Sequence, residues 1–356
     1  MPRRSIASMG FADASANLDS IARKLNVSVS TVSRALRGVP GIHSATRNRI
    51  VLEARRQGYV LRGVERQRET EVKNILALCH IRSPRGSAEF LEGISQAAQP
   101  LGFNLMTHFL PPEDSASIFD PARQPPCLRE NTVDGIIFLH RWPHDVVARL
   151  SAQIPCVSVV HRYPGTITET VGFDDRLGMD LLMAHLLKTG ARRIGFYGYC
   201  QEMTWSRSRV SAWMETMLQH RLAMTAEDVI SIKLEEALSE ALVAKSYSLE
   251  VAAERTRQGI QAWVCANDST ALSLCHFFQK RGIKVPSQVQ VTGFHRQSHI
   301  PDATPVLTTV RVDSREVGVA ALRRLAHRFR YPKESPRVIL LPCSLEMGET
   351  TLAERP

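Results

Sequence analysis

The sequence lacks the common residue patterns that catalyse reactions. A nucleophile elbow (G-x-S-x-G), a dinucleotide loop (G-x-G-x-x-G after a strand), a phosphate loop (G-x-x-x-x-G-K) and a zinc helix (H-E-x-x-H) are all absent from the 356 residues. Two histidine pairs have a spacing that suits metal ligands, His140/His144 and His295/His299. Pro143 interrupts a helix through the first pair, and the second pair follows a strand end. We therefore expect no enzyme activity, no metal site and no cofactor.

The cysteines indicate a reducing environment. They are seven in number, lie far apart and never form a C-x-x-C pair, which suits neither a disulfide framework nor a thiolate zinc site. The first residues contain no apolar run of signal-peptide length, and no later run approaches the ~20 apolar residues of a membrane span. We expect a soluble cytoplasmic protein.

Positive charge is concentrated at the N-terminal end. Residues 1–70 hold 13 of the 45 Lys and Arg residues but only five of the 35 acids, so this segment carries most of the net charge of +10. Lys and Arg side chains that neutralise phosphates release condensed counterions, which favours binding to a polyanion. A solubilising basic tail is the alternative, but a tail would lack the ordered apolar pattern found in this segment.

That apolar pattern predicts three short helices. Asn17 can cap a first helix that ends before Asn26, a residue that tolerates the left-handed conformation of a tight turn. Ser28 can cap a second helix over residues 29–36, and a third begins at Ser44. The apolar residues expected to share one core are Leu18, Ile21, Ala22, Leu25, Val32, Leu36, Ile50 and Ala54. Such a compact unit is typical of DNA-binding heads.

The rest of the chain has a different pattern. Residues 61–71 are almost wholly polar and form a linker, or a helix that cannot bury itself alone. From Lys73 onward, short apolar runs alternate with amphipathic stretches, which is typical of parallel sheets covered by helices. Strands are expected at NILALCHI, FNLMTH, GIIFLH, CVSVV, ETVGF, RRIGFYGY, AWVCAN and VQVTGF. Eight units exceed one doubly wound sheet and predict two lobes with a cleft between them. Residues 111–126 are expected to form a surface loop.

Several stretches resemble one known family in the correct order. SIARKLNVSVSTVSRALRGVPGIHSATRNRIVLEARRQGYV resembles the head of the lactose/galactose repressor (LacI/GalR) family. The similarity continues through VGFDDRLGMDLLMAHLLKTGARRIGFYG, AWVCANDSTAL, RGIKVPSQVQVTGF and LTTVRVDSREVG, and covers about residues 17 to 352. It implies an all-α helix-turn-helix head joined to an α/β two-lobed core like a periplasmic binding protein, with two doubly wound parallel sheets and three crossovers.

The same resemblance implies an organisation and a function. The head would be 1–60, the hinge or linker 61–71, the N-terminal lobe 72–167 with 311–331, and the C-terminal lobe 168–310 with 332–356. The expected function is a sequence-specific transcription regulator, with repression as the expected action. Its expected partners are palindromic double-stranded operator DNA, a small-molecule effector (a sugar, sugar acid or other small metabolite) and a second copy of the chain, with no membrane.

The resemblance assigns DNA contacts to the second helix. Val29, Ser30 and Arg34 map onto the family's base-reading positions, and an arginine can donate two hydrogen bonds to guanine O6 and N7. The residues placed for phosphate contacts are Ser28, Thr31, Ser33 and Arg47. Ser28 also fits a purely capping role, and Thr31 a solvated face.

The linker departs from the family pattern. Relatives follow G-Y-x-P-N with a hinge helix whose leucine wedges into the minor groove, but here the proline, asparagine and leucine are all replaced. Either Val64 takes the wedge role, or Arg62, Arg66 and Arg68 clamp phosphates; we favour phosphate contacts. Whether the operator is kinked stays open.

Effector-binding residues are also mapped from the family. SRVSAW supplies Arg209 as the effector anchor, and AND supplies Asn267 and Asp268. Two positions that are commonly aspartate are histidines here, His161 in VVHRYP and His295 after Gly-Phe. The remaining candidates that face the expected cleft are Arg82, Ser83, Asp174 and Trp205.

Two interpretations of the histidines stay open. Loss of two acidic acceptors while Arg209 is kept favours an anionic effector, whose affinity would rise as the histidines become protonated from pH about 8 to about 6. Alternatively, His161 and His295 accept from hydroxyls as neutral rings, or merely pack. Trp142, Trp205 and Trp263 are stacking candidates, although core positions are more common for tryptophan. A periplasmic solute-binding protein would share the core, but the basic head and the missing signal peptide argue against it.

Overall fold

The computed structural model describes residues 17–36, 41–57, 59, 72–81, 84–237, 247–295 and 305–354. Within these ranges, every helix is too short or too polar to span a lipid bilayer.

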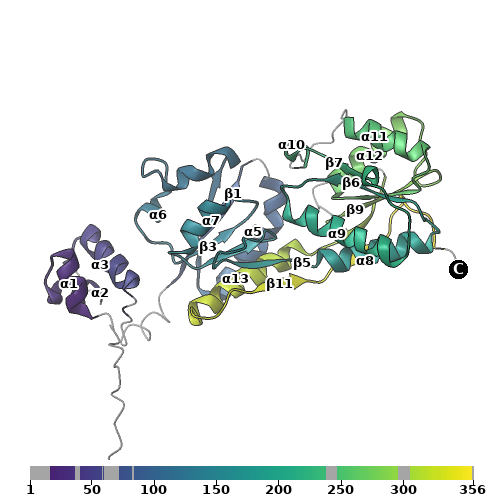
Figure 1. Cartoon of the computed structure of the whole chain (residues 1–356). Helices are drawn as coiled ribbons and strands as arrows, with labels where there is room; N and C mark the ends of the chain where they lie inside the picture. Colours follow the sequence, from purple (N-terminus) through teal and green to yellow (C-terminus); the bar gives the residue numbers. More distant parts are fainter. Residues whose placement is uncertain are drawn as a thin grey trace, which may run out of the picture. The chain divides into compact units, whose positions relative to one another are not determined.

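The head consists of three helices whose ends follow the predicted capping residues (Figure 1). They are α1 (Leu18–Leu25), α2 (Val29–Leu36) and α3 (Ser44–Arg56). The Asn17 side chain accepts the backbone N–H of Ser20 at 2.8 Å, and Asn26 has a left-handed φ of 53°. Ser28 Oγ accepts the N–H of Thr31 at 3.1 Å and so caps α2. The predicted caps are therefore confirmed.

The core of the head also matches the predicted pattern. Ile21, Val32 and Ile50 are completely buried, and each comes from a different helix. Leu18, Leu25 and Leu36 pack around them while partly exposed. The helix-turn-helix is thus held by a small apolar centre, which leaves the polar face of α2 in solvent.

A six-stranded parallel sheet forms the N-terminal lobe. Its strand order is β11-β5-β4-β3-β1-β2. The strands are β1 (Asn74–His80), β2 (Asn104–Leu110), β3 (Gly135–Phe138), β4 (Cys156–Val159), β5 (Glu169–Phe173) and β11 (Val338–Leu341). The helices of this part of the chain are α5 (Pro84–Leu101), the 3-10 helix η1 (Pro112–Phe119), α6 (Pro126–Arg129), α7 (His144–Ser151) and α13 (Ser314–Arg330).

A second six-stranded sheet forms the C-terminal lobe, in the order β12-β10-β9-β8-β6-β7. Only the β10–β12 pair is antiparallel. The strands are β6 (Ile194–Tyr199), β7 (Val229–Ser231), β8 (Ala262–Cys265), β9 (Gln290–Phe294), β10 (Thr308–Arg311) and β12 (Ser344–Glu346). The helices are α8 (Asp175–Lys188), α9 (Thr204–Gln219), η2 (Ala226–Asp228), α10 (Leu234–Ala237), α11 (Tyr247–Arg257) and α12 (Asp268–Lys280).

The chain crosses between the two sheets three times. It leaves the first sheet after β5, returns after β10, and crosses again between β11 and β12. Figure 1 shows the late segments α13 and β11, in yellow, lying within the earlier lobe. The expected lobe boundary at residue 167 therefore requires correction, because β5 lies in the first sheet. The ETVGF strand pairs with β4 before the chain crosses, so the first lobe extends to Phe173. The later segment of this lobe, expected at 311–331, also needs extending, because β11 (Val338–Leu341) pairs with β5 in the first sheet.

The structure also bears on the stretch 111–126 and on the tryptophans. The stretch 111–126 is not a simple surface loop, because Pro112–Phe119 forms a 3-10 helix in which Ile118 is completely buried. Trp142 and Trp263 are core residues, with 1% and 0% of their surface exposed, whereas Trp205 stays half-buried. The apolar residues Ile118 and Phe119 at the end of PEDSASIF were the available signal that this stretch is not simply exposed.

Helices α5 and α13 touch backbone to backbone in the N-terminal lobe. A Cβ atom added at Gly93 would lie 1.9 Å from the carbonyl oxygen of Arg315, and one added at Gly318 would lie 2.2 Å from that of Phe90. Both distances are far below van der Waals contact. Only glycine permits this approach, which fixes α13 against α5.

Replacing Gly318 by alanine should therefore destabilise the core, although alanine is the better helix former by about 1 kcal/mol. We expect a net loss of about 1–3 kcal/mol, because the added methyl group must push two backbones apart. Urea denaturation followed by circular dichroism measures this change. Arg323→Ala, at an exposed position of the same helix, is the control and should change stability by less than about 0.5 kcal/mol. A Gly318→Ala protein as stable as the wild type would contradict the close contact.

Candidate functional site

The polar face of α2 carries the side chains predicted to contact DNA. Val29 is 40% exposed, and Ser30 and Arg34 are exposed one helical turn apart on the same face. A guanidinium beside a small hydroxyl on an exposed helix face can reach the edges of bases in a major groove. The structure thus brings the predicted base-reading residues together.

The hydroxyl groups at the start of α2 form a cluster. Ser28 Oγ lies 2.8 Å from Ser30 Oγ and 2.7 Å from Thr31 Oγ1, in addition to capping the helix. Ser33 and Arg47 are both half-buried. Capping therefore accounts for Ser28 in the absence of DNA, and a phosphate contact would be an additional role. Arg62 and Arg66 lie outside the described residues.

In the core, Arg209 is the most constrained of the predicted effector-binding residues. Its side chain on α9 is only 3% exposed. The Nε atom donates to Asp175 Oδ1 at 2.8 Å, and Nη1 donates to the carbonyl oxygen of Ala266 at 2.6 Å. The guanidinium also lies over the ring of Phe294 at 3.6 Å and near that of Trp205 at 4.9 Å. Four elements at one end of the second sheet thus hold a single cation.

Asp175 was missed by the sequence analysis, which selected only its neighbour Asp174. Asp174 Oδ1 accepts the N–H of Leu177 at 3.0 Å and caps α8, whereas Asp175 turns toward Arg209. Burial raises the pKa of Asp175, and the charge and hydrogen bond of Arg209 oppose that rise. The Asp-Asp doublet in VGFDD was the signal, since consecutive residues of a helix point about 100° apart.

Asn267 and Asp268 have structural partners within the C-terminal lobe. Asn267 caps α12 by accepting the N–H of Thr270 at 2.9 Å. Asp268 is 3% exposed and accepts a hydrogen bond from Thr309 Oγ1 at 2.6 Å. These contacts tie the end of β8 to β10. They place both residues at the expected edge of the sheet.

His295 follows β9 and contacts the N-terminal lobe. Its ring centroid lies 5.0 Å from that of Phe173 and 6.3 Å from that of Phe90. Its Nε2 atom lies 3.0 Å from Ser314 Oγ, where α13 begins. The residue has a φ of 100°, which is strained for a residue with a side chain. His295 is therefore held at the boundary between the lobes.

His161 forms the second contact between the lobes. It follows β4, and its Nδ1 atom lies 3.1 Å from Thr204 Oγ1 at the start of α9. Burial, together with repulsion from Arg141, Arg207 and the protonated forms of His140 and His80, lowers the pKa of His161 to about 3. The expectation that this ring titrates near neutrality is therefore wrong. His161 is uncharged at pH 7.

Two further histidines lie beside His161 and were not predicted to bind a ligand. His80 and His140 stack with ring centroids 5.7 Å apart, and the N–H of His80 donates to His140 Nδ1 at 3.0 Å. Burial lowers the pKa of His80 to about 4. The available signal was the recurrence of histidine at the ends of β1, β3, β4 and β9, in NILALCH, GIIFLH, CVSVVH and QVTGFH.

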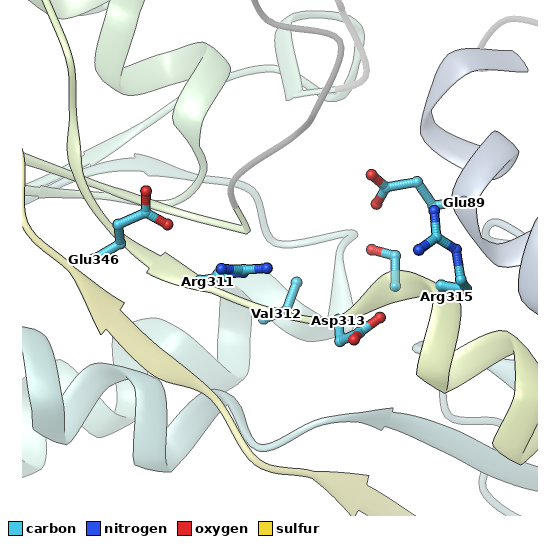
Figure 2. A pocket seen from close by; sticks show the side chains of 7 residues that line it. Glu89, Arg311, Val312, Asp313, Arg315 and Glu346 are labelled. Carbon is cyan, nitrogen blue, oxygen red and sulfur yellow. The ribbon is translucent and has the colours of Figure 1, made fainter.

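A cavity of about 420 Å³ lies along the crossover from β10 to α13 (Figure 2). Its lining comes from both lobes: Glu89, Arg311, Val312, Asp313, Ser314, Arg315 and Glu346. Figure 2 shows Arg311 and Glu346 on neighbouring strands of the second sheet. Ser314 lines this cavity, and its Oγ atom lies 3.0 Å from His295 Nε2. None of its charged residues was predicted, and Arg82 and Ser83, which were predicted for the cleft, lie outside the described residues.

The arrangement is suited to binding and not to bond breaking. It offers one compensated guanidinium, uncharged imidazoles, hydroxyls and amide groups at facing strand ends. The described residues contain no group of three or more His, Cys, Asp or Glu side chains that could hold a metal ion.

Comparisons with known proteins agree with this architecture. Residues 17–60 match the model described as bacterial regulatory proteins, lacI family, and residues 183–351 match a periplasmic binding protein-like domain. A relative from Streptomyces coelicolor, the HTH-type transcriptional regulator MalR, is 28% identical over 94% of this chain and 97% of its own length.

Solved structures share the fold over nearly the whole chain. The lac repressor dimer bound to operator and the anti-inducer ONPF has a TM-score of 0.63 at 19% identity, covering 95% of this chain and 99% of that one. The complex of the transcriptional regulator CelR with cellobiose has a TM-score of 0.65 at 21% identity, covering 94% and 99%.

The lowered pKa values of His80 and His161 predict a loss of stability in acid. Each histidine binds a proton below pH ~6.5 when unfolded but stays neutral when folded, so each should remove about 1 kcal/mol per pH unit between that value and its folded pKa. Thermal unfolding at pH 7.5 and 5.5 measures the effect. His161→Gln should flatten the dependence, whereas His220→Gln, at an exposed position, should leave it unchanged. An unaltered slope in His161→Gln would refute burial of a neutral ring.

Proposed function

Since the chain belongs to the LacI family of bacterial regulatory proteins, we propose that it regulates transcription by binding operator DNA through its head and an effector through its core. The exposed face of α2 supports this proposal most directly, because Val29, Ser30 and Arg34 project from a helix that is capped and packed on its opposite side. Repression in the cytoplasm is the simplest action for such a protein.

The proposed DNA contacts divide into two kinds. Arg34 reads guanine, with Val29 and Ser30 beside it, and these contacts carry the sequence preference. Ser28, Thr31, Ser33 and Arg47 contact phosphates and set the register of the head on the duplex. Arg62 and Arg66 add phosphate contacts from the linker. Repulsion among the basic residues of residues 1–70 is relieved when DNA neutralises them.

The proposed effector is a small polar molecule in the cleft between the lobes, a sugar, sugar acid or other small metabolite. Arg209, Asn267 and Asp268 at the strand ends of the C-terminal lobe would face His161 across the cleft. Trp205 offers a ring for stacking, since it is half-buried beside Arg209. His295 and Asp174 complete the proposed set from the same lobe.

The two contacts between the lobes supply a route for regulation. His161 pairs with Thr204, and His295 packs against Phe90 and Phe173. An effector that binds better to one arrangement of the lobes shifts the population toward it. Such a shift changes DNA affinity only if it alters how two heads are presented to one operator.

The first prediction for this function concerns the two classes of DNA contact. Arg34→Ala should reduce discrimination between operator and random DNA by about tenfold to a hundredfold per half-site, because a bidentate guanine contact is worth ~1–3 kcal/mol. Arg47→Ala should weaken binding to both DNAs alike. An operator selected from a random library with wild-type protein, followed by fluorescence anisotropy at several salt concentrations, measures both effects. Equal loss of specificity in the two variants would overturn the division of roles.

The second prediction is a homodimer on a palindromic operator. One three-helix head covers too little DNA for useful affinity, whereas paired heads read two half-sites. Sedimentation at micromolar concentration should give a dimer, and the selected operator should contain an inverted repeat. A monomer that stays monomeric on operator DNA would contradict this proposal without affecting the assignment of Arg34.

A further inference from the structure

The charge balance around Arg209 differs from the one expected from the sequence. The sequence predicts no acid that competes for this guanidinium, because His161 and His295 occupy two positions that are commonly aspartate in the family. The structure places Asp175 at 2.8 Å from Arg209 Nε, with 13% of the Asp175 side chain exposed and 3% of the Arg209 side chain. A cation and an anion so close form a neutral pair, whose field falls off faster with distance than the field of the guanidinium alone.

The pair leaves defined hydrogen-bonding atoms available. Nε and Nη1 of Arg209 are used by Asp175 and by the carbonyl oxygen of Ala266. Among the described residues, Arg209 Nη2 has no hydrogen-bond partner. Asp175 accepts from Arg209 through Oδ1, and Ser208 also lies within hydrogen-bonding reach. A hydroxyl group can accept from this donor nitrogen without bringing a charge of its own.

Two further carboxylates belong to the same strand ends. Asp174 caps the same helix as Asp175, and buried Asp268 follows β8 beside Ala266 and Asn267. Three carboxylates thus accompany one guanidinium at these strand ends. Across the cleft, His80 and His161 are uncharged at pH 7. Arg141 and Arg207 are positive charges on the side of His161, so the carboxylate in direct contact with Arg209 is the one that decides the charge of the anchor itself.

We infer that Asp175 is the residue that sets the charge preference of the effector site, because it cancels Arg209 and makes the anchor select an uncharged, hydroxyl-bearing group. Without Asp175, the same guanidinium would be a buried, unpaired cation and would accept a carboxylate or phosphate. Asp175 also orients the planar fork of Arg209 by fixing its Nε edge. This inference rests on the proposed effector site for the class of ligand, but the pairing of Asp175 with Arg209 can be tested without knowing the effector.

The test measures thermal unfolding of the full-length protein in sodium chloride and in sodium phosphate of equal ionic strength. Asp175→Asn should unfold roughly 5–15 °C below the wild type in chloride, because it leaves a buried charge unpaired. Inorganic phosphate should then raise its melting temperature by about 2–4 °C in a saturable manner, and should leave the wild type unchanged. Asp180→Asn removes the same charge from an exposed position of α8 and should behave like the wild type in both salts.

A double variant keeps the test decisive if Asp175→Asn folds poorly. Asp175→Asn with Arg209→Gln removes both charges, so it should recover most of the lost melting temperature and should ignore phosphate. Absence of recovery, or equal phosphate sensitivity in wild type and Asp175→Asn, would overturn the inference.

Ligand preference is then read from matched neutral and anionic probes, D-glucose with D-glucuronate and D-galactose with D-galacturonate. Any probe that stabilises the wild type should be the neutral sugar of its pair. Asp175→Asn should shift the binding preference of the protein toward the sugar acid. A wild type stabilised by the acid would refute the inference. If no probe changes operator binding, the proposed effector function is in question, whereas the phosphate result still decides the role of Asp175.

Discussion

The guanidinium of Arg209 is removed from water, and its burial sets requirements that several elements must meet together. α9 supplies the side chain, the first turn of α8 supplies Asp175, the residue after β8 supplies a carbonyl oxygen, and the last residue of β9 supplies a ring face. These partners meet because β9, β8 and β6 are neighbours in a parallel sheet, so that their carboxyl ends share one edge. This one buried charge thus joins four elements of the C-terminal lobe.

The two lobes bury ionisable side chains in different ways. The C-terminal lobe compensates a charge with a charge, whereas the N-terminal lobe keeps His80 and His161 uncharged. The contacts that His161 and His295 make between the lobes are two histidine–hydroxyl pairs and a cluster of rings. The His161 contact therefore adds no charge to the boundary between the lobes.

Sequence patterns predicted the head in detail and the core in outline. The caps at Asn17 and Ser28 are local hydrogen bonds, so residue type and helical spacing are enough to locate them. The lobe boundary failed at β5 because the pairing of ETVGF with β4 depends on strands that are distant in sequence. The role of Asp175 was not predicted for a similar reason. Which of two adjacent aspartates caps a helix, and which turns inward, depends on where Arg209 lies in three dimensions.

The close backbone approaches at Gly93 and at Gly318 give the N-terminal lobe a mechanical property. At these two points no side chain lies between α5 and α13 that could change rotamer, so a displacement of one helix there must move the other. α13 has 17 residues and a length of about 25 Å, and its first residue pairs with His295. About three turns further along, Arg324 is hydrogen-bonded to buried Glu169 at the start of β5. The helix is therefore a stiff rod that connects the boundary between the lobes, at Ser314, to the interior of the first sheet, at Glu169.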